Sequence, residues 1–276
     1  MNIVDSNWLN KNINDKDIKI LDCSWHLPNT SRIGKSEFLN ERIPSSIFFD
    51  IDFFSDEDSE YPHMLSDKKT FSHKMSMLGL ENKDHIICYD SIGIFSAARA
   101  SWMIGQYGHN KVSILNGGLK KWKIDEFEIE KGDCKTLSKS NYIASKEPDD
   151  VVNFEDIKIN IIKNTFQLID ARPKGRYEGI DPEPRAELKS GHIEKSKNIP
   201  FLYLINEENG CLKNNEDLKK IFNEHDIKGS ENAVFSCGSG VAATVVGMAY
   251  KKIYNKNFKI YDGSWTEWAL KNKILK

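Results

Sequence analysis

The sequence predicts an α/β fold made of two similar halves, each a parallel sheet flanked by helices. Short apolar runs, each closed by a polar or glycine turn, recur along the 276-residue chain with helical patterns between them. Such runs are typical of buried parallel strands that crossover helices connect. The pattern begins twice, which indicates duplication. The expected strands cover residues 18–21, 86–89, 112–115, 167–170, 233–236 and 258–261.

In the first half, each expected strand ends at a turn that can close a buried strand. Asp22 follows the first run, Asp90-Ser-Ile-Gly follows the second, and Asn116-Gly-Gly follows the third. Polar and glycine-rich turns directly after apolar runs commonly end strands. We therefore expect one parallel sheet in this half.

The second half repeats these turns at nearly constant spacing. Asp170 lies 148 residues after its counterpart, Cys237-Gly-Ser-Gly lies 147 residues after, and Asp262-Gly-Ser-Trp lies 146 residues after. Markers in the same order and at the same spacing favour a tandem duplication over chance.

The two halves are expected to be joined by a polar linker. Residues 131–150 are rich in Lys, Ser and Asp and poor in apolar residues, as linkers often are. We place the boundary near residue 145. The predicted domains are 1–145, which includes the linker from about residue 130, and 146–276, which contains Cys237.

The charge balance and the length of the apolar runs argue against two kinds of partner, nucleic acids and membranes. The 39 Lys and Arg nearly balance the 41 Asp and Glu, so a net charge of -2 offers no field to hold a nucleic acid. The longest run of small and apolar residues, 241–250, has about half the length of a bilayer span. We expect neither nucleic acid nor membrane as a partner. The first residues lack the features of a secretory signal, so a cytoplasmic location is expected.

The cysteines and histidines follow no metal or disulfide pattern. The five cysteines are an odd number without a C-x-x-C pair, and the seven histidines show no ligand spacing. We therefore expect no metal site and no disulfide framework.

Cys237 is the residue best placed for chemistry. It directly follows an apolar strand and precedes Gly238-Ser-Gly and a helix of small residues. At such a turn, backbone N–H groups and the positive end of the helix dipole favour the thiolate over the thiol. The glycines allow the loop to fold back around the sulfur. A nucleophilic thiolate is expected, and a buried structural cysteine is the alternative.

The segment from Ser236 to Ala243 resembles the active-site loop of the tandem rhodanese-like sulfurtransferases, and among them the 3-mercaptopyruvate sulfurtransferases. The resemblance covers nearly the whole chain. It implies two similar α/β domains, of which the first is catalytically inactive because Asp90 replaces the cysteine. The blocks similar to that family are Ile47-Phe-Phe-Asp-Ile-Asp52, Tyr61-Pro-His-Met-Leu65, Phe95-Ser-Ala-Ala-Arg99, Asn116-Gly-Gly-Leu-Lys-Lys-Trp122, Asp170-Ala-Arg-Pro173, Pro182-Glu-Pro-Arg185, Ser190-Gly-His-Ile193 and Tyr261-Asp-Gly-Ser-Trp265.

The resemblance also implies a reaction. Cys237 attacks the sulfur of 3-mercaptopyruvate, keeps it as a persulfide and releases pyruvate. An acceptor then removes the outer sulfur: a thiol, such as thioredoxin or a small thiol, or cyanide. The transfer needs no cofactor. N–H donors that stabilise the thiolate can also stabilise the anionic persulfide.

By the same resemblance, Arg176 and Arg185 bind the carboxylate of the 2-oxo acid. Arg suits this role because two parallel N–H bonds fix orientation as well as charge. The loop residues Gly238, Gly240 and Val241 are expected to contact the substrate. The alternative for the arginines is surface pairing with their acidic neighbours, which are Glu178, Glu183 and Glu187.

Proton transfer is assigned by resemblance to Ser239, Asp52 and His63, which requires the first domain to face the cysteine loop. For Asp52, a capping role or an ion pair is the alternative. The chain departs from the family at Ala242, where Thr is usual, so one loop hydroxyl is missing.

Three other functions fit the sequence less well. A thiosulfate sulfurtransferase usually has Arg and Lys directly after the cysteine, where this chain has Gly238 and Ser239, so mercaptopyruvate is favoured as the donor. A cysteine phosphatase needs Arg at the sixth position after the cysteine, which is Ala243 here. A non-enzymatic sulfur-relay or binding module is the third, because a fold can persist without its chemistry.

Overall fold

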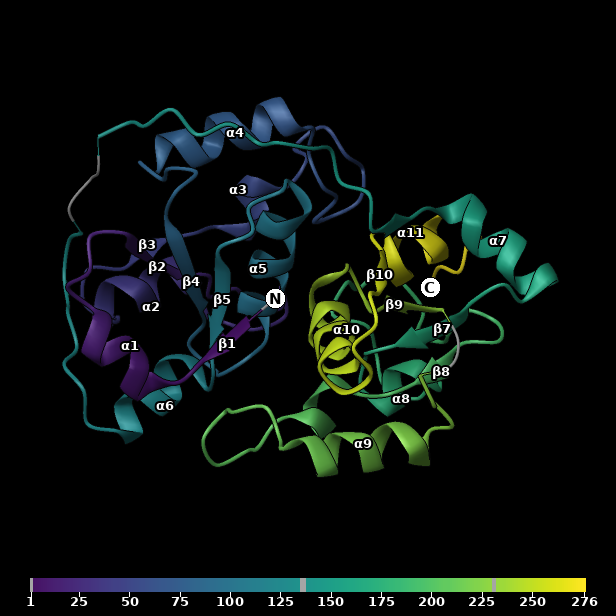
Figure 1. Ribbon diagram of the computed structural model, residues 1–276. Helices are drawn as coiled ribbons and strands as arrows, with labels where there is room; N and C mark the ends of the chain where they lie inside the picture. The colour runs from purple at the N-terminus through teal and green to yellow at the C-terminus, as the bar shows by residue number, and fades with distance from the viewer. Residues whose placement is uncertain (1, 135–137, 230–231) are drawn as a thin grey trace.

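The computed structural model describes residues 2–134, 138–229 and 232–276, which form two five-stranded parallel sheets flanked by helices (Figure 1). The predicted α/β class and the duplication are confirmed. In Figure 1 the two sheets lie in separate lobes, and the helices α5 (Ser96–Gln106) and α10 (Val241–Tyr254) lie where the lobes meet.

The first sheet has the strand order β1-β5-β4-β2-β3. Its longest strands, β2 and β4, lie side by side in the interior of the sheet. The strands are β1 (Asn2–Val4), β2 (Ile18–Asp22), β3 (Ile47–Phe48), β4 (His85–Tyr89) and β5 (Val112–Leu115). The helices are α1 (Ser6–Asn12), α2 (Gly34–Asn40), α3 (Ile51–Phe54), α4 (Lys68–Met77), α5 (Ser96–Gln106) and α6 (Gly118–Ile124).

The second sheet has the order β6-β10-β9-β7-β8, so each strand occupies the place of its counterpart in the first sheet. The strands are β6 (Val151–Val152), β7 (Gln167–Asp170), β8 (Lys197–Asn198), β9 (Ala233–Ser236) and β10 (Lys259–Tyr261). The helices are α7 (Phe154–Lys163), α8 (Lys174–Tyr177), α9 (Asn215–Glu224), α10 (Val241–Tyr254) and α11 (Ser264–Lys271), with a 3₁₀ turn over Phe201–Leu204.

The two domains are joined by the packing of α5 against α10. Small side chains predominate at the start of both helices, which lets their backbones approach closely. Residues 241–250 of α10 are all buried. One hydrophobic cluster runs through both domains and includes Phe95 and Ala97 of the first and Val241 and Val245 of the second. The loop that follows β9 therefore lies at the domain interface.

The chain that follows α6 returns across the first domain. Tyr142 is buried, and the backbone N–H groups of Ile143 and Ala144 donate to the side chains of Asn82 and Ser72. This part of the expected linker is therefore packed on the first domain, while residues 135–137 lie outside the described residues. Within the described ranges, none of the helices has both the length and the apolar character needed to cross a bilayer.

Candidate functional site

Cys237 lies in the loop between β9 and α10. The residue is only 3% exposed. Gly240 ends the loop with a φ of 77°, in the left-handed region that favours glycine. The Ser264 hydroxyl accepts hydrogen bonds from the backbone N–H groups of Cys237 and Gly240, each 3.1 Å long. The loop is thus fixed at both ends, with the cysteine next to the N-terminus of α10.

A cavity of about 270 Å³ lies between the domains and contains Cys237 in its lining. The first domain contributes Trp25 and Phe95, and the second contributes Phe201 and Leu202. The rings of Phe95 and Phe201 stack across the interface with their centroids 5.0 Å apart. Mostly apolar walls with a few charged groups are typical of a small-molecule site.

Arg176 and Arg185 line the same cavity but are held differently. Arg176 donates to Glu183 through Nε and Nη2, at 3.1 and 2.5 Å. This arginine therefore pairs with one of its acidic neighbours, as the alternative interpretation expected. Among the described residues, Arg185 forms no hydrogen bond or ion pair. Burial lowers the pKa of Arg185, and attraction to Cys237 opposes that effect. Because a guanidinium is too basic to lose its proton in a protein, the group stays a cation.

Ser239, His63 and Asp52 form a hydrogen-bonded chain across the domain interface. Nδ1 of His63 lies 2.8 Å from the Ser239 hydroxyl, and Nε2 lies 2.8 Å from Oδ1 of Asp52. With the ring proton on Nε2, facing the carboxylate, Nδ1 is free to accept the proton of the Ser239 hydroxyl. The imidazole is therefore placed for proton transfer to or from Ser239.

Trp25 supports this chain from the first domain. Its indole N–H donates to Oδ2 of Asp52 at 3.0 Å, and its ring packs edge-on against the His63 imidazole at 4.8 Å. Desolvation alone would raise the pKa of Asp52, but the hydrogen bonds from His63 and Trp25 outweigh it, so the pKa lies below its usual value. An ionised carboxylate keeps the imidazole in one orientation.

The structure brings most of the predicted site residues to one cavity. Cys237, Gly238, Ser239 and Val241 line it together with the two arginines. His63 is buried on the far side of Ser239 and does not line the cavity. Asp52 lies beyond His63, with 61% of its side chain exposed.

Gly240, predicted to contact the substrate, lies outside the cavity lining. A Cβ at this position would lie 3.0 Å from Nη1 of Arg99 and 3.2 Å from the carbonyl of Asp262. The positive φ and this close packing account for the glycine. Its position therefore supports a structural role in the loop.

Three side chains that shape the site carry little signal in the sequence: Trp25, Ser264 and Thr266. Thr266 Oγ1 donates to the carbonyl of Gly238 at 2.7 Å, and so helps to fix the cysteine loop. Ser264 belongs to the repeated turn that marks the duplication, but the repeat does not reveal its contact with the cysteine loop. Nothing in the sequence pattern points to Trp25.

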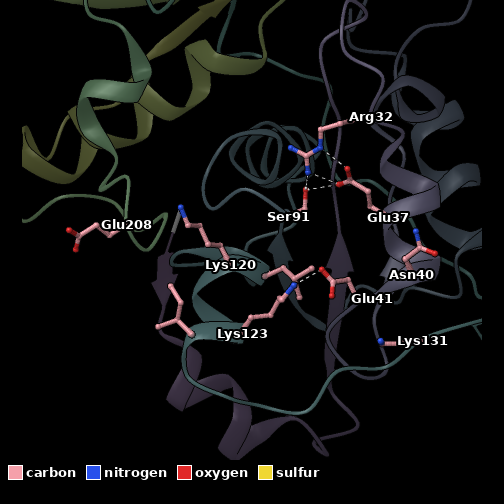
Figure 2. Close-up of a pocket in the computed structure, with 11 residues that line it drawn as sticks. Arg32, Glu37, Asn40, Glu41, Ser91, Lys120, Lys123, Lys131 and Glu208 are labelled. Atoms are coloured by element: carbon pink, nitrogen blue, oxygen red, sulfur yellow. Dashed lines mark hydrogen bonds and ion pairs between the residues drawn. The ribbon is translucent and has the colours of Figure 1, made fainter.

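A larger cavity of about 1040 Å³ lies beside α2 and α6 of the first domain (Figure 2). Its charged side chains largely neutralise one another: Arg32 pairs with Glu37, and Lys123 pairs with Glu41. None of its described lining residues is a cysteine, a histidine or a predicted site residue. Within the described part of the chain, no group of three or more His, Cys, Asp or Glu side chains is arranged to bind a metal ion. The cavity at Cys237 is therefore the candidate site.

Known proteins share both the sequence and the fold. The family model for the rhodanese-like domain matches residues 5–125 and 154–271. A 3-mercaptopyruvate sulfurtransferase of Escherichia coli is 39% identical over 267 residues, which cover 96% of this chain and 94% of the relative. The thiosulfate/3-mercaptopyruvate sulfurtransferase 1 of Arabidopsis thaliana, named as mitochondrial, is 38% identical over 287 residues, which cover 97% and 76%.

Solved structures agree with these relatives. The 3-mercaptopyruvate sulfurtransferase SseA of Escherichia coli superposes with a TM-score of 0.86 at 38% identity, covering 95% of this chain and 98% of that one. The Tum1 protein of Saccharomyces cerevisiae superposes with a TM-score of 0.91 at 31% identity, covering 100% and 97%. The fold and the cysteine loop thus define a protein with two rhodanese-like domains in tandem. The chain belongs to the rhodanese-like family and is a sulfurtransferase.

Proposed function

We propose that Cys237 takes the sulfur of 3-mercaptopyruvate as a persulfide and passes it to an acceptor. The observation that carries this proposal is the joint placement of a buried cysteine, two cavity arginines and the hydrogen-bonded Ser239–His63 pair. The names of the relatives from Escherichia coli and Arabidopsis support the choice of donor.

In the first step, the Cys237 thiolate attacks the sulfur of the donor, an S–S bond forms, and the C–S bond breaks. The electron pair of the broken bond goes to the carbon that becomes the methyl group of pyruvate. The proton of the donor thiol is transferred to that carbon, and Ser239 and His63 offer a route for it. Pyruvate leaves, and the enzyme keeps an anionic persulfide.

The loop after β4 in the first domain corresponds to the Cys237 loop, and it holds an anionic group. Asp90 stands at the position of Cys237, and its carboxylate accepts hydrogen bonds from four backbone N–H groups of its own loop. The N–H groups of Ile92, Gly93, Phe95 and Ala97 lie at 3.1, 2.9, 2.8 and 3.0 Å. We propose the same kind of contact for the persulfide on Cys237.

Arg185 is the group that we assign to the donor carboxylate. It is a cation at the cavity with no partner among the described residues, so its donors are free for a ligand. Arg176 adds a second charge, but Glu183 already occupies part of its guanidinium. Gly238 and Val241 complete the contacts with the small donor.

In the second step, the acceptor attacks the outer sulfur of the persulfide and releases the Cys237 thiolate. We propose a thiol, such as thioredoxin or a small thiol, or cyanide as the acceptor.

We also propose that the boundary between the two domains lies near residue 145. A cytoplasmic location stays a prediction, because one Arabidopsis relative is named as mitochondrial.

Thiosulfate is the second candidate donor, since several relatives carry it in their names. The test is to measure kcat/KM for 3-mercaptopyruvate and for thiosulfate with the same acceptor. We expect a clear preference for mercaptopyruvate, because the cysteine is followed by Gly238 and Ser239 and not by two cations. A preference for thiosulfate would overturn the choice of donor.

A further inference from the structure

The domain interface has an internal pseudosymmetry, so one molecule contains two versions of the same contact. A segment of the first domain, residues 51–65, reaches the loop after β9. The matching segment of the second domain, residues 201–212, reaches the loop after β4, where Gly210 packs against Gly93. An isolated β-bridge closes each segment, Ser55 with Leu65 in one and Ile205 with Leu212 in the other.

At a spacing of 147 residues, His63 corresponds to Gly210, and both residues have a positive φ, of 65° and 73°. The residue two positions later is anchored alike in both segments. The Leu65 N–H donates to Oδ2 of Asp262 at 2.8 Å, and the Leu212 N–H donates to the side-chain oxygen of Asn116 at 2.9 Å. A neutral Asn is thus sufficient to anchor such a segment.

Only the half that faces Cys237 adds an ion pair. Arg99, on α5, donates to Oδ1 of Asp262 at 2.7 Å and also to the backbone carbonyl of His63. Both charged side chains are almost fully buried. At a spacing of 146 to 147 residues, the position on α10 that corresponds to Arg99 is Val245 or Val246.

A buried ion pair is a weak means of stabilising this interface. Desolvation of the two charges offsets much of their attraction, and the other half manages with valine and Asn116. The feature that differs between the halves is the side chain at the positive-φ position. In the half that faces Cys237 this side chain is the imidazole of His63, whereas the other half has Gly210, which has no side chain. Arg99 holds the carbonyl of His63, and Asp262 holds the N–H two residues later.

We propose that Arg99 and Asp262 are positioning residues that fix the backbone of His63, so that its imidazole reaches Ser239. Neither residue lines the cavity, so neither can contact the donor directly. Arg99 also donates to the backbone carbonyl of Gly240 at 3.4 Å, so it links the backbone of His63 to the cysteine loop. The inference rests on the proposed function, in which His63 moves a proton. It adds the contacts that orient the imidazole toward Ser239 across the domain interface.

The test compares kcat and KM for 3-mercaptopyruvate in full-length variants. Asp262→Asn keeps an acceptor for the Leu65 N–H, as Asn116 does for Leu212, but removes the charge that orients Arg99. We expect kcat to fall about tenfold or more, with KM changed less than about twofold. The matched control is Asn116→Ala, which removes the corresponding anchor in the other half and should leave kcat within about twofold.

A double variant separates positioning from stability. Arg99→Met with Asp262→Asn leaves no unpaired buried charge, so its melting temperature should stay near that of the wild type while kcat stays low. In a His63→Ala background, the double change should lower kcat by less than about twofold further, because all three residues act together.

The outcomes distinguish this inference from the proposed function. If His63→Ala lowers kcat but the folded double variant turns over at the wild-type rate, the positioning role is wrong. The same holds if the double change costs as much in the His63→Ala background as in the wild type. If His63→Ala itself keeps the wild-type kcat, the proposed proton transfer is wrong, and the positioning role falls with it.

Discussion

Arg185 and Arg176 lie at the same cavity, but only Arg185 has its guanidinium donors free of a partner among the described residues. A free, partly buried guanidinium keeps two parallel donors for a planar carboxylate. Part of the Arg176 guanidinium already donates to Glu183, so only the rest is available to a ligand in the cavity. The difference predicts unequal roles for two residues that resemblance alone treats as a pair.

Arg185→Lys should raise KM for mercaptopyruvate more than Arg176→Lys does. Lysine keeps the charge but loses the fork, and the loss at Arg185 should be about 1.5 to 3 kcal/mol in kcat/KM, the size of a charged hydrogen bond. Steady-state kinetics of both variants measures the difference. Equal effects, or unchanged kinetics in both, would contradict the assignment of the carboxylate site to Arg185.

Asp22 and Asp170 end corresponding strands in different electrostatic surroundings. Arg172 pairs with Asp170 at 2.6 Å, whereas the matching position after Asp22 is Ser24, whose N–H donates at 2.9 Å. Burial raises the pKa of Asp22 to about 6, despite the hydrogen bonds from Ser24. The wild-type chain is therefore stabilised by protonation of Asp22 and loses that contribution as pH rises through about 6.

Asp22→Asn removes this buried charge and should change how stability depends on pH. At about pH 8 the variant should be more stable than the wild type by about 2 to 3 kcal/mol, and the difference should shrink toward about pH 4. Urea unfolding of both proteins across this range measures it. A difference that does not vary with pH would show that the pKa of Asp22 is the same in the folded and the unfolded chain.

Individual site residues differ in how visible they are in the sequence. Cys237 is visible because its strand, glycine loop and helix are contiguous in the chain. Arg99 acts across the domain interface on Asp262, whereas Trp25 contacts Asp52 and His63 of its own domain. These partners lie far apart in sequence, and no spacing rule connects them. Gly240 lies outside the cavity lining, which the sequence does not reveal, because periodic patterns do not show which side of a loop faces a cavity.

At the scale of elements, the interior strands of both sheets follow the sequence closely. All six expected strands lie within one residue of β2, β4, β5, β7, β9 and β10. Their apolar runs are long enough to mark a strand buried on both faces. The strands β1, β3, β6 and β8 have only two or three residues, so neither a run nor an alternation reveals them. They pair because the neighbouring strand offers free backbone groups.

Gly240→Ala tests the turn that joins the cysteine loop to α10. A methyl group there requires a left-handed backbone and meets Arg99 at 3.0 Å. We expect a loss of about 1 to 3 kcal/mol in stability together with a lower kcat. Gly105→Ala on α5 is the control, because a Cβ there meets nothing within 4 Å, and it should leave stability unchanged or raise it by up to about 1 kcal/mol. Equal behaviour of the two variants would show that the turn tolerates a side chain.

At the scale of the whole molecule, residues of the first domain complete the site around the Cys237 loop. His63, Asp52 and Trp25 come from the first domain, and the cavity wall combines Phe95 with Phe201. The first domain therefore contributes to the site even though its own loop holds Asp90 in place of a cysteine. The sequence predicts the duplication and the need for facing domains, but not which helices pack together.

A fragment over residues 146–276 should not transfer sulfur at the wild-type rate. Without the first domain it loses the imidazole and exposes the face of α10 that packs on α5, so both catalysis and solubility should suffer. Activity assays of the fragment, alone and mixed with a 1–145 fragment, measure this. Turnover at the full rate by 146–276 alone would show that the first domain plays no part in the chemistry.

The most direct test of the central claim is the mass of the full-length protein after incubation with 3-mercaptopyruvate and no acceptor. We expect one additional sulfur atom, located on Cys237 by peptide mapping, and one equivalent of pyruvate in solution. Cys237→Ser should show neither, while Cys134→Ser should behave like the wild type. Sulfur found on another cysteine, or pyruvate released by Cys237→Ser, would contradict the account.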